Sequence, residues 1–322
     1  MEKLKKEEFK NAIIDLKKEK NAVVLAHYYQ EKDIQEVADY IGDSLGLAVE
    51  ASKTDADIIV FAGVHFMAET AKLLNPSRKV VLPDLEAGCS LADSCPPDQF
   101  KAFVDAYPDH KVVTYVNCSA EVKALSDIVC TSSNAVDIIN SFPPEQKLIF
   151  APDQNLGKYL IKETGRDLVL WEGACIVHEA FSFDKLLKLK NENPSAKVVA
   201  HPESEPHILD VADYVGSTSK MINYIKTSEH QTFIVGTEAG ILHELSKQAP
   251  GKTLIPLPIH EDNTCACSEC AFMKVNTLEK VYNCLLHETP EINIADSIFE
   301  KAKEPIVKMI EFSALNPAPV EN

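Results

Sequence analysis

The chain has 322 residues, 45% hydrophobic and 25% charged, which is the composition of a soluble globular protein and excludes the fibrous and disordered classes. At about 100–200 residues per domain, this length predicts two or three domains. The 49 acidic residues outnumber the 32 basic ones and leave a net charge of −17. That charge repels phosphate backbones and anionic lipids, so neither a nucleic acid nor a membrane is an expected partner.

In chain order, the first predicted element is an amphipathic helix at residues 4–20, LKKEEFKNAIIDLKKEK. This start has no apolar core of the kind found in signal peptides, and no apolar run approaches the ~18 residues of a membrane-spanning helix. We therefore expect a cytoplasmic protein. A second flanking amphipathic helix is predicted near the other end, at residues 297–313.

Between these helices, one unit occurs three times. The copies begin VVLAHYY at 23–29, VVTYVN at 112–117 and VVAHPE at 198–203, and each apolar run predicts a buried strand with a polar side chain at its end. A helical stretch, an acidic residue, a short second strand and a hydroxyl residue follow. The strand-end residue and the hydroxyl lie 17 positions apart in every copy, as His27 and Ser44, Tyr115 and Ser132, and His201 and Thr218.

The second half of each copy adds two strands with an amphipathic helix between them and ends in cysteine, at Cys89, Cys175 and Cys270. Strands that alternate with helices predict parallel sheets covered on both faces. The expected fold class is therefore α/β, with three homologous three-layer αβα domains in pseudo-threefold arrangement around a central active site. The predicted domains are 1–108 with the N-terminal helix, 109–194, and 195–322 with the C-terminal helix.

The cysteines point to a metal centre. Nine cysteines, an odd number in an apparently intracellular chain, favour metal ligation over disulfides. Ligands collect at the carboxyl ends of parallel strands, so Cys89, Cys175 and Cys270 can share one site. Three thiolates suit either a zinc ion with a fourth ligand or a [4Fe-4S] cluster with one open iron. The open iron would provide the Lewis acid that dehydration needs, but the residues alone leave the metal undecided.

Eight local motifs, spread in order over nearly the whole chain, resemble those of quinolinate synthases. They are AHYYQ at 26–30, GDSLGLA at 42–48, AGCSLADSCP at 87–96, TYVNCSAEVKA at 114–124, CTSSNA at 130–135, AHPE at 200–203, GSTS at 216–219 and CAFMKVNTLEK at 270–280. The resemblance implies a transferase of NAD (pyridine nucleotide) biosynthesis. Such an enzyme condenses iminoaspartate (iminosuccinate) with dihydroxyacetone phosphate to give quinolinate, phosphate and two waters.

The resemblance also implies the cofactor and the partners. One oxygen-sensitive [4Fe-4S] cluster per chain is expected, with Cys89, Cys175 and Cys270 as its three ligands and its open iron as Lewis acid. An aspartate-oxidising enzyme is a possible functional partner, because it would supply the imine.

A substrate site is implied as well. Glu203 is the only carboxylate among the six polar strand-end groups, so we expect it to act as the general base, with Tyr29 and His201 as the other catalytic residues. The expected substrate-binding residues are His27, Ser44, Tyr115, Val116, Asn117, Ser132, His201, Pro202, Glu203, Ser217 and Thr218.

Several alternatives stay open. Ser44, Ser132 and Thr218 are equally typical of helix N-caps, although a helix N-terminus is itself an anion site. A zinc-dependent lyase or hydrolase, or a non-enzymatic iron–sulfur redox sensor, would use the same three cysteines. The polar strand ends favour an enzyme over a sensor.

Further residues have two interpretations or a structural one. Cys265 and Cys267 are redox-active thiols or loop residues. Four polar residues line the cavity or hold turns, namely His65, Glu69, Asp153 and Asn155. The remaining cysteines are interpreted as packing residues, namely Cys95, Cys118, Cys130 and Cys284.

Overall fold

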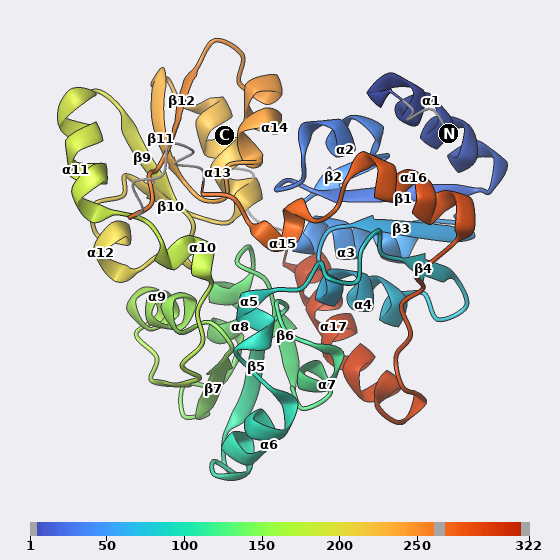
Figure 1. The fold of residues 1–322 in the computed structure, drawn as a ribbon. Helices are drawn as coiled ribbons and strands as arrows, with labels where there is room; N and C mark the ends of the chain where they lie inside the picture. Colours follow the sequence, from blue (N-terminus) through green and yellow to red (C-terminus); the bar gives the residue numbers. More distant parts are fainter. Residues whose placement is uncertain (1–4, 261–267, 317–322) are drawn as a thin grey trace. The chain divides into compact units, whose positions relative to one another are not determined.

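The structure is a computed structural model that describes residues 5–260 and 268–316 (Figure 1). In these ranges the strands form three four-stranded sheets with the orders β2-β1-β3-β4, β6-β5-β7-β8 and β10-β9-β11-β12. The strand pairs whose register is resolved are all parallel. The three sheets therefore share one topology, which confirms the predicted threefold α/β repeat.

The strand bounds follow the apolar runs of the repeat. The first sheet contains β1 (Ala22–His27), β2 (Tyr40–Gly42), β3 (Ile58–Ala62) and β4 (Lys79–Val81). The second contains β5 (Lys111–Tyr115), β6 (Ile128–Cys130), β7 (Leu148–Ala151) and β8 (Leu168–Leu170). The third contains β9 (Lys197–Ala200), β10 (Tyr214–Val215), β11 (Thr232–Gly236) and β12 (Thr253–Pro256).

Helices connect the strands and flank the sheets. Those before β9 are α1 (Lys6–Glu19), α2 (Lys32–Val37), α3 (Ser44–Lys53), α4 (His65–Leu74), α5 (Ser90–Asp93), α6 (Pro97–Asp105), α7 (Ala120–Lys123), α8 (Ala135–Ser141), α9 (Gln154–Thr164), α10 (Ile176–Glu179) and α11 (Phe183–Glu192). The rest are α12 (Pro206–Leu209), α13 (Thr218–Thr227), α14 (Ile241–Gln248), α15 (Ala271–Lys274), α16 (Leu278–His287) and α17 (Asp296–Leu315). Both predicted flanking helices are present, as α1 and α17.

The chain folds into two compact units. Unit 1 comprises Met1–Pro108, Val116–Val129 and Ala271–Asn322, and unit 2 comprises Asp109–Tyr115 and Cys130–Cys270. Within unit 1, α16 packs against α1 although the two helices lie at opposite ends of the sequence (Figure 1). The three-domain division at 108/109 and 194/195 stays a prediction.

The core of unit 1 is a sheet with helices on both faces. One apolar cluster joins β1 and β3 to α1, α2 and α16, with Ile13, Val24 and Val281 fully buried. On the other face, α3 and α4 pack on each other and on the sheet. Because both faces are covered, every residue of β3 is buried and the strand reads as a continuous apolar run.

In unit 2, the sheet that contains β9 is covered on one face by α11 and α12, through Leu186 and Ile208. Elsewhere in this unit α14 packs on α13 and on β12, and α8 packs on α9, which covers β7 and β8. In each sheet the first and third strands of the repeat are neighbours, so their connections leave toward opposite edges. In α/β proteins, ligands bind at the carboxyl ends of two neighbouring strands that are connected in this way.

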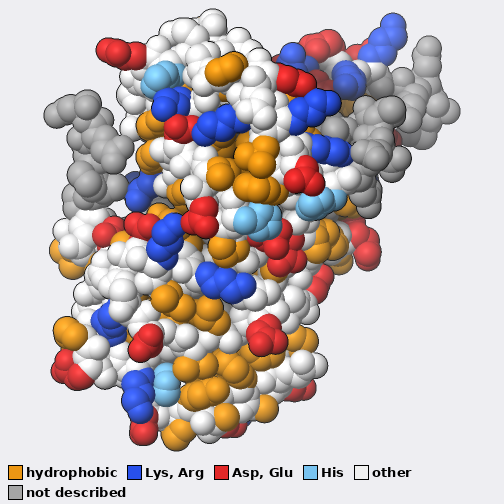
Figure 2. All heavy atoms as spheres, turned by 90° about the vertical axis from the view of Figure 1, so that its left-hand side faces the viewer, with side chains coloured by type: hydrophobic (Ala, Val, Ile, Leu, Met, Phe, Trp, Pro, Cys, Tyr) orange, Lys and Arg blue, Asp and Glu red, His pale blue; other side chains and the backbone are white. Residues whose placement is uncertain are grey.

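Within the described ranges, none of the helices combines the length and apolar character that crossing a membrane would need. The face drawn in Figure 2 carries Lys and Arg side chains interspersed with Asp and Glu. The cytoplasmic location stays a prediction.

Candidate active site

The three predicted ligand cysteines occupy equivalent positions in the structure, each directly before a helix of four residues. Cys89 is the N-cap of α5, Cys175 is the N-cap of α10, and Cys270 precedes α15. All three are partly exposed, whereas the described cysteines that we interpreted as packing residues are buried, namely Cys95, Cys118, Cys130 and Cys284. The three thiols that we predicted as cluster ligands are therefore the accessible ones among the described cysteines. Cys265 and Cys267 lie outside the described residues.

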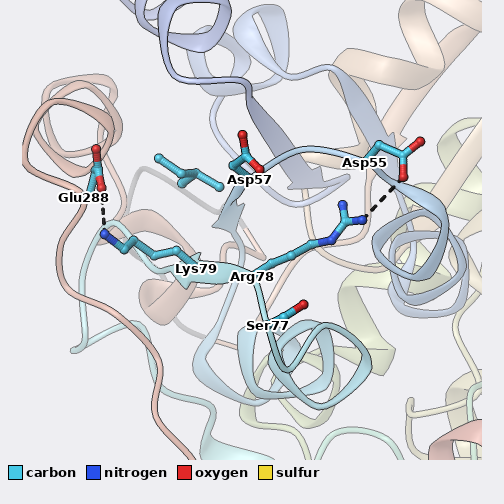
Figure 3. A pocket seen from close by; sticks show the side chains of 7 residues that line it. Asp55, Asp57, Ser77, Arg78, Lys79 and Glu288 are labelled. Atoms are coloured by element: carbon cyan, nitrogen blue, oxygen red, sulfur yellow. Dashed lines mark hydrogen bonds and ion pairs between the residues drawn. The ribbon is translucent and has the colours of Figure 1, made fainter.

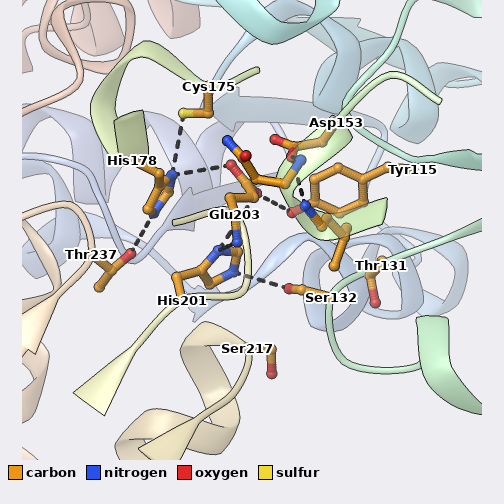
Figure 4. Close-up of polar contacts among 12 residues, drawn as sticks. Tyr115, Thr131, Ser132, Asp153, Cys175, His178, His201, Glu203, Ser217 and Thr237 are labelled. Carbon is orange, nitrogen blue, oxygen red and sulfur yellow. Dashed lines mark hydrogen bonds and ion pairs between the residues drawn. The ribbon is translucent and has the colours of Figure 1, made fainter. Parts of the chain in front are cut away.

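Unit 2 places a buried carboxylate at the end of β9 and surrounds it with polar groups (Figure 4). The side chain of Glu203 is only 4% exposed. The Tyr115 hydroxyl donates a hydrogen bond of 2.6 Å to its Oε1. Nδ1 of His178 lies 3.1 Å from Oε2, and Nδ1 of His201 lies 3.6 Å from Oε1. Two strand-end residues predicted from the repeat, Tyr115 and His201, thus meet at the predicted general base.

Each imidazole is also held from its other side. Nε2 of His178 lies 3.0 Å from the Thr237 hydroxyl, and Nε2 of His201 lies 3.1 Å from the Ser132 hydroxyl. The two rings stack, with centroids 4.8 Å apart and an interplanar angle of 28°. Contacts at both ring nitrogens restrict the orientation of each imidazole, so the groups around Glu203 are preorganised.

The pKa of Glu203 is shifted in the direction opposite to that expected for a buried acid. Burial favours the protonated form of Glu203, but the charges of His178 and His201 and the hydrogen bonds from His178 and Tyr115 hold the pKa of its carboxyl at about 2. Glu203 is therefore ionised at neutral pH. Asp153 lies in the same region, and burial together with the charge of Glu203 raises the pKa of its carboxyl well above the ordinary value.

The hydroxyl residues of the repeat lie at helix starts but are not the N-caps. Ser44 and Thr218 are the first residues of α3 and α13, whose N-caps are Asp43 and Ser217. Ser132 lies two residues before Asn134, the N-cap of α8. The N-cap interpretation of these hydroxyls is therefore wrong by one or two residues. Ser217 caps through its hydroxyl, which accepts from the Lys220 amide and also contacts the Ser133 hydroxyl at 2.9 Å.

Three other predicted binding residues of unit 2 are buried. Pro202 is buried between His201 and Glu203. Ser217 is fully buried and Thr218 is 3% exposed. The position of Asp153 is explained by a structural role, because its carboxylate caps α9 by accepting from the backbone amides of Asn155 and Leu156.

Unit 1 holds the remaining predicted residues. His27 is the last residue of β1, and its ring lies 4.4 Å from that of Tyr29, centroid to centroid. Ser44 and Val116 line one small gap beside α3. Asn117 has a buried side-chain oxygen for which the described residues provide no hydrogen-bond partner. An acceptor in this state suits a ligand that brings its own donor.

Comparison with known proteins now bears on the identity of the site. The family model "Quinolinate synthetase A protein" matches residues 11–311. The quinolinate synthase of Microcystis aeruginosa is 60% identical over 302 residues, which cover 94% of both chains. Those of Thermosynechococcus vestitus and Synechocystis sp. are 59% and 58% identical, each over 94% of both chains.

The chain belongs to the quinolinate synthase family. Members of this family make quinolinate for NAD biosynthesis and use a [4Fe-4S] cluster. The transferase function predicted from the motifs is thereby confirmed, and the zinc enzyme and the redox sensor are no longer needed as alternatives.

One residue of this quinolinate synthase site was not predicted from the internal repeat of the sequence. His178 contacts both Cys175 and Glu203, yet the repeat does not point to it, because Ala92 and Met273 occupy the equivalent positions in the other copies. The available signal was local: Cys175 and His178 are three residues apart, a spacing that puts them on one side of a helix. The partnership with Glu203 depends on tertiary structure.

Glu238 was missed as well. This residue is fully buried after β11, at the repeat position that Asp153 occupies after β7. Its carboxylate accepts from the backbone amide of Gly240 at 2.6 Å and from that of Cys270 at 3.1 Å. Glu238 therefore fixes the backbone at one of the predicted ligand cysteines.

A second hollow, of about 530 Å³, lies on unit 1 between the first sheet and the end of α16 (Figure 3). Its charges are paired with one another: Lys79 bonds Glu288 at 2.6 Å, and Arg78 lies 3.4 Å from Asp55. Cations that are already neutralised in this way form a poor anion site, so we assign no role in quinolinate synthesis to this hollow.

Proposed function

We propose that Glu203 handles protons during the formation of quinolinate from iminoaspartate and dihydroxyacetone phosphate, together with His201 and Tyr29. The observation that carries the proposal is a carboxylate that is almost fully buried, yet kept ionised by two imidazoles and a phenol. Such a group has no evident use in packing alone, because burying a charge costs free energy even where polar partners compensate it.

The low pKa of Glu203 suits a base that is activated by its substrate. A pKa of about 2 makes the resting carboxylate a weak proton acceptor. When the carboxylates of iminoaspartate bind beside His201, they share its positive charge and add a like charge near Glu203. Both effects raise the pKa of Glu203 toward neutrality. Proton abstraction therefore begins only when substrate occupies the site.

Anionic substrates also need local attraction in a chain with a net charge of −17. The N-terminal turns of α3 and α13 provide backbone amides and the positive end of a helix dipole. Ser44 and Thr218 lie in those turns and extend them with hydroxyl donors. We propose that these groups, with His27, Tyr115, Asn117, Ser132 and the 201–203 segment, bind the carboxylates and the phosphate.

We further propose Cys89, Cys175 and Cys270 as the ligands of the family's [4Fe-4S] cluster. Their equivalence in the repeat and their partial exposure among the described cysteines support this set. When bound, the cluster supplies a Lewis-acidic iron for the loss of hydroxyl groups. The protein residues then hold the substrates, exclude water from the reactive imine and move protons.

Changing Glu203 to Gln tests the assignment. Quinolinate formation should fall by about 10²–10⁴-fold, because the amide keeps the shape of the side chain but accepts no proton. The absorbance spectrum of the cluster should be retained. The matched control is Glu205→Gln, two residues further on, where the side chain is 35% exposed and its carboxylate lies 3.6 Å from Nε2 of the exposed His207. Wild-type turnover in the Glu203 variant would refute the proposal.

A further inference from the structure

Three donor atoms of different chemistry lie together in unit 2. They belong to Cys175, His178 and Glu203, and all lie within 4.8 Å of one another. The Cys175 sulfur is 3.2 Å from Nδ1 of His178, and that nitrogen is 3.1 Å from Oε2 of Glu203. In a tetrahedral zinc site with bonds of about 2.0–2.3 Å, neighbouring donors are about 3.3–3.6 Å apart. The two separations that involve Nδ1 of His178 are slightly shorter than this, and the donors of Cys175 and Glu203 lie within 4.8 Å of each other, so small side-chain shifts would admit an ion.

The donors are also oriented for binding. Nε2 of His178 contacts the Thr237 hydroxyl at 3.0 Å, and this contact holds the ring with Nδ1 directed at the Cys175 sulfur and the Glu203 carboxylate. His178 and Glu203 are each about 3% exposed, while Cys175 is partly exposed and gives an ion a route inward.

We propose that these three residues form a site for a single thiophilic divalent cation, such as Zn²⁺, in chains that have not acquired their cluster. A thiolate and a carboxylate together neutralise the dication, and binding releases to solvent the thiol proton of Cys175 and the proton that Nδ1 of His178 shares with Glu203. A bound ion also occupies a cysteine that the cluster needs, so zinc competes with cluster assembly. Only this second statement rests on the proposed ligand set of the cluster.

Cobalt(II) is the probe for the site, because it takes zinc's geometry and absorbs light. The cluster-free full-length chain is titrated anaerobically with Co²⁺. We expect one ion per chain, with a thiolate-to-cobalt charge-transfer band and the visible bands of a four-coordinate ion. Cys175→Ser should abolish the charge-transfer band. His178→Gln and Glu203→Gln should each weaken binding by at least the roughly 10–100-fold that the loss of an outer-shell partner costs.

Two controls separate this site from other thiols. His207→Gln alters an exposed histidine of the same unit, with a side chain 45% exposed, and should leave binding unchanged. The triple variant Cys265→Ser, Cys267→Ser, Cys270→Ser removes the other closely spaced cysteines and should keep the full signal. Loss of the charge-transfer band in the triple variant would overturn the site. So would a cobalt affinity that is the same in His178→Gln and Glu203→Gln as in the wild-type chain.

The competition is tested by adding one equivalent of zinc before iron and sulfide. In the wild-type chain, the absorbance of the cluster should fail to develop, whereas His178→Gln should assemble its cluster despite the zinc. Equal assembly in both chains would overturn the competition while the cobalt result still decides the site. Neither measurement uses quinolinate formation, so a negative result here would not refute the proposed function.

Discussion

The pKa values of two buried carboxyl groups of unit 2 are shifted in opposite directions, although burial acts on both in the same sense. Burial raises the pKa of Asp153, whose neighbours are backbone amides and the charged Glu203. Glu203 is equally buried, but two imidazoles and a phenol reverse the effect and hold its pKa at about 2. The charged partners therefore decide which acid ionises. The sequence could predict Glu203 from its strand-end position, but it could not predict His178, because their contact joins segments that are not adjacent in the chain.

Asp153 gives a prediction about pH. Because its pKa in the folded state lies above the ordinary value of 3.8, the folded state holds the proton more tightly, and stability falls as the pH rises above that value. Asp153→Asn removes the titrating group and keeps a capping side chain. Urea unfolding at pH 4 and pH 7 should therefore show the variant gaining stability relative to wild type at the higher pH.

The matched variant Asp153→Ala also loses the cap on α9 and should be less stable than Asp153→Asn by about 0.5–2 kcal/mol at both pH values. A wild-type chain whose difference from Asp153→Asn is the same at pH 4 and pH 7 would contradict the raised pKa.

At the scale of elements, the strands were the most predictable part. Their apolar runs and the repeated spacing of 17 residues located β1, β5 and β9, because a buried parallel strand needs apolar residues on both faces. The helices of four residues that follow the predicted ligand cysteines were not predictable, since one turn is too short to carry a periodic pattern. The N-caps were missed because the repeat aligned on the residue after the cap, as at Ser44 and Thr218.

Helix α1 shows how a flanking helix is held, and it gives the second prediction. Ile13 is fully buried in the cluster that includes α16, whereas its neighbour Ile14 is 38% exposed. Ile13→Ala should lower the free energy of unfolding by about 2–5 kcal/mol, because it removes buried methyl groups and leaves a cavity. Ile14→Ala should change it by less than about 1 kcal/mol. Denaturant unfolding of both variants provides the measurement, and equal losses would show that α1 does not dock through Ile13.

At the scale of the whole molecule, the negative net charge opposes the binding of anionic substrates. A chain with a charge of −17 repels anionic substrates, and we propose that local groups such as His201 and the first turns of α3 and α13 supply the attraction. The repeat predicted three sheets and three equivalent cysteines from sequence alone. It could not predict that α16 and α17 belong to unit 1, because their packing against α1 and α4 joins segments that are far apart in the sequence.

The most direct test of the account is an assay of quinolinate. The full chain is prepared and reconstituted anaerobically, its iron and sulfide are verified, and it receives freshly generated iminoaspartate with dihydroxyacetone phosphate. We predict that quinolinate and phosphate form together, and that exposure of the same preparation to air, which destroys the cluster, stops both. A chain that carries four irons and makes no quinolinate, or one that makes it equally well after its cluster has been lost, would contradict the account.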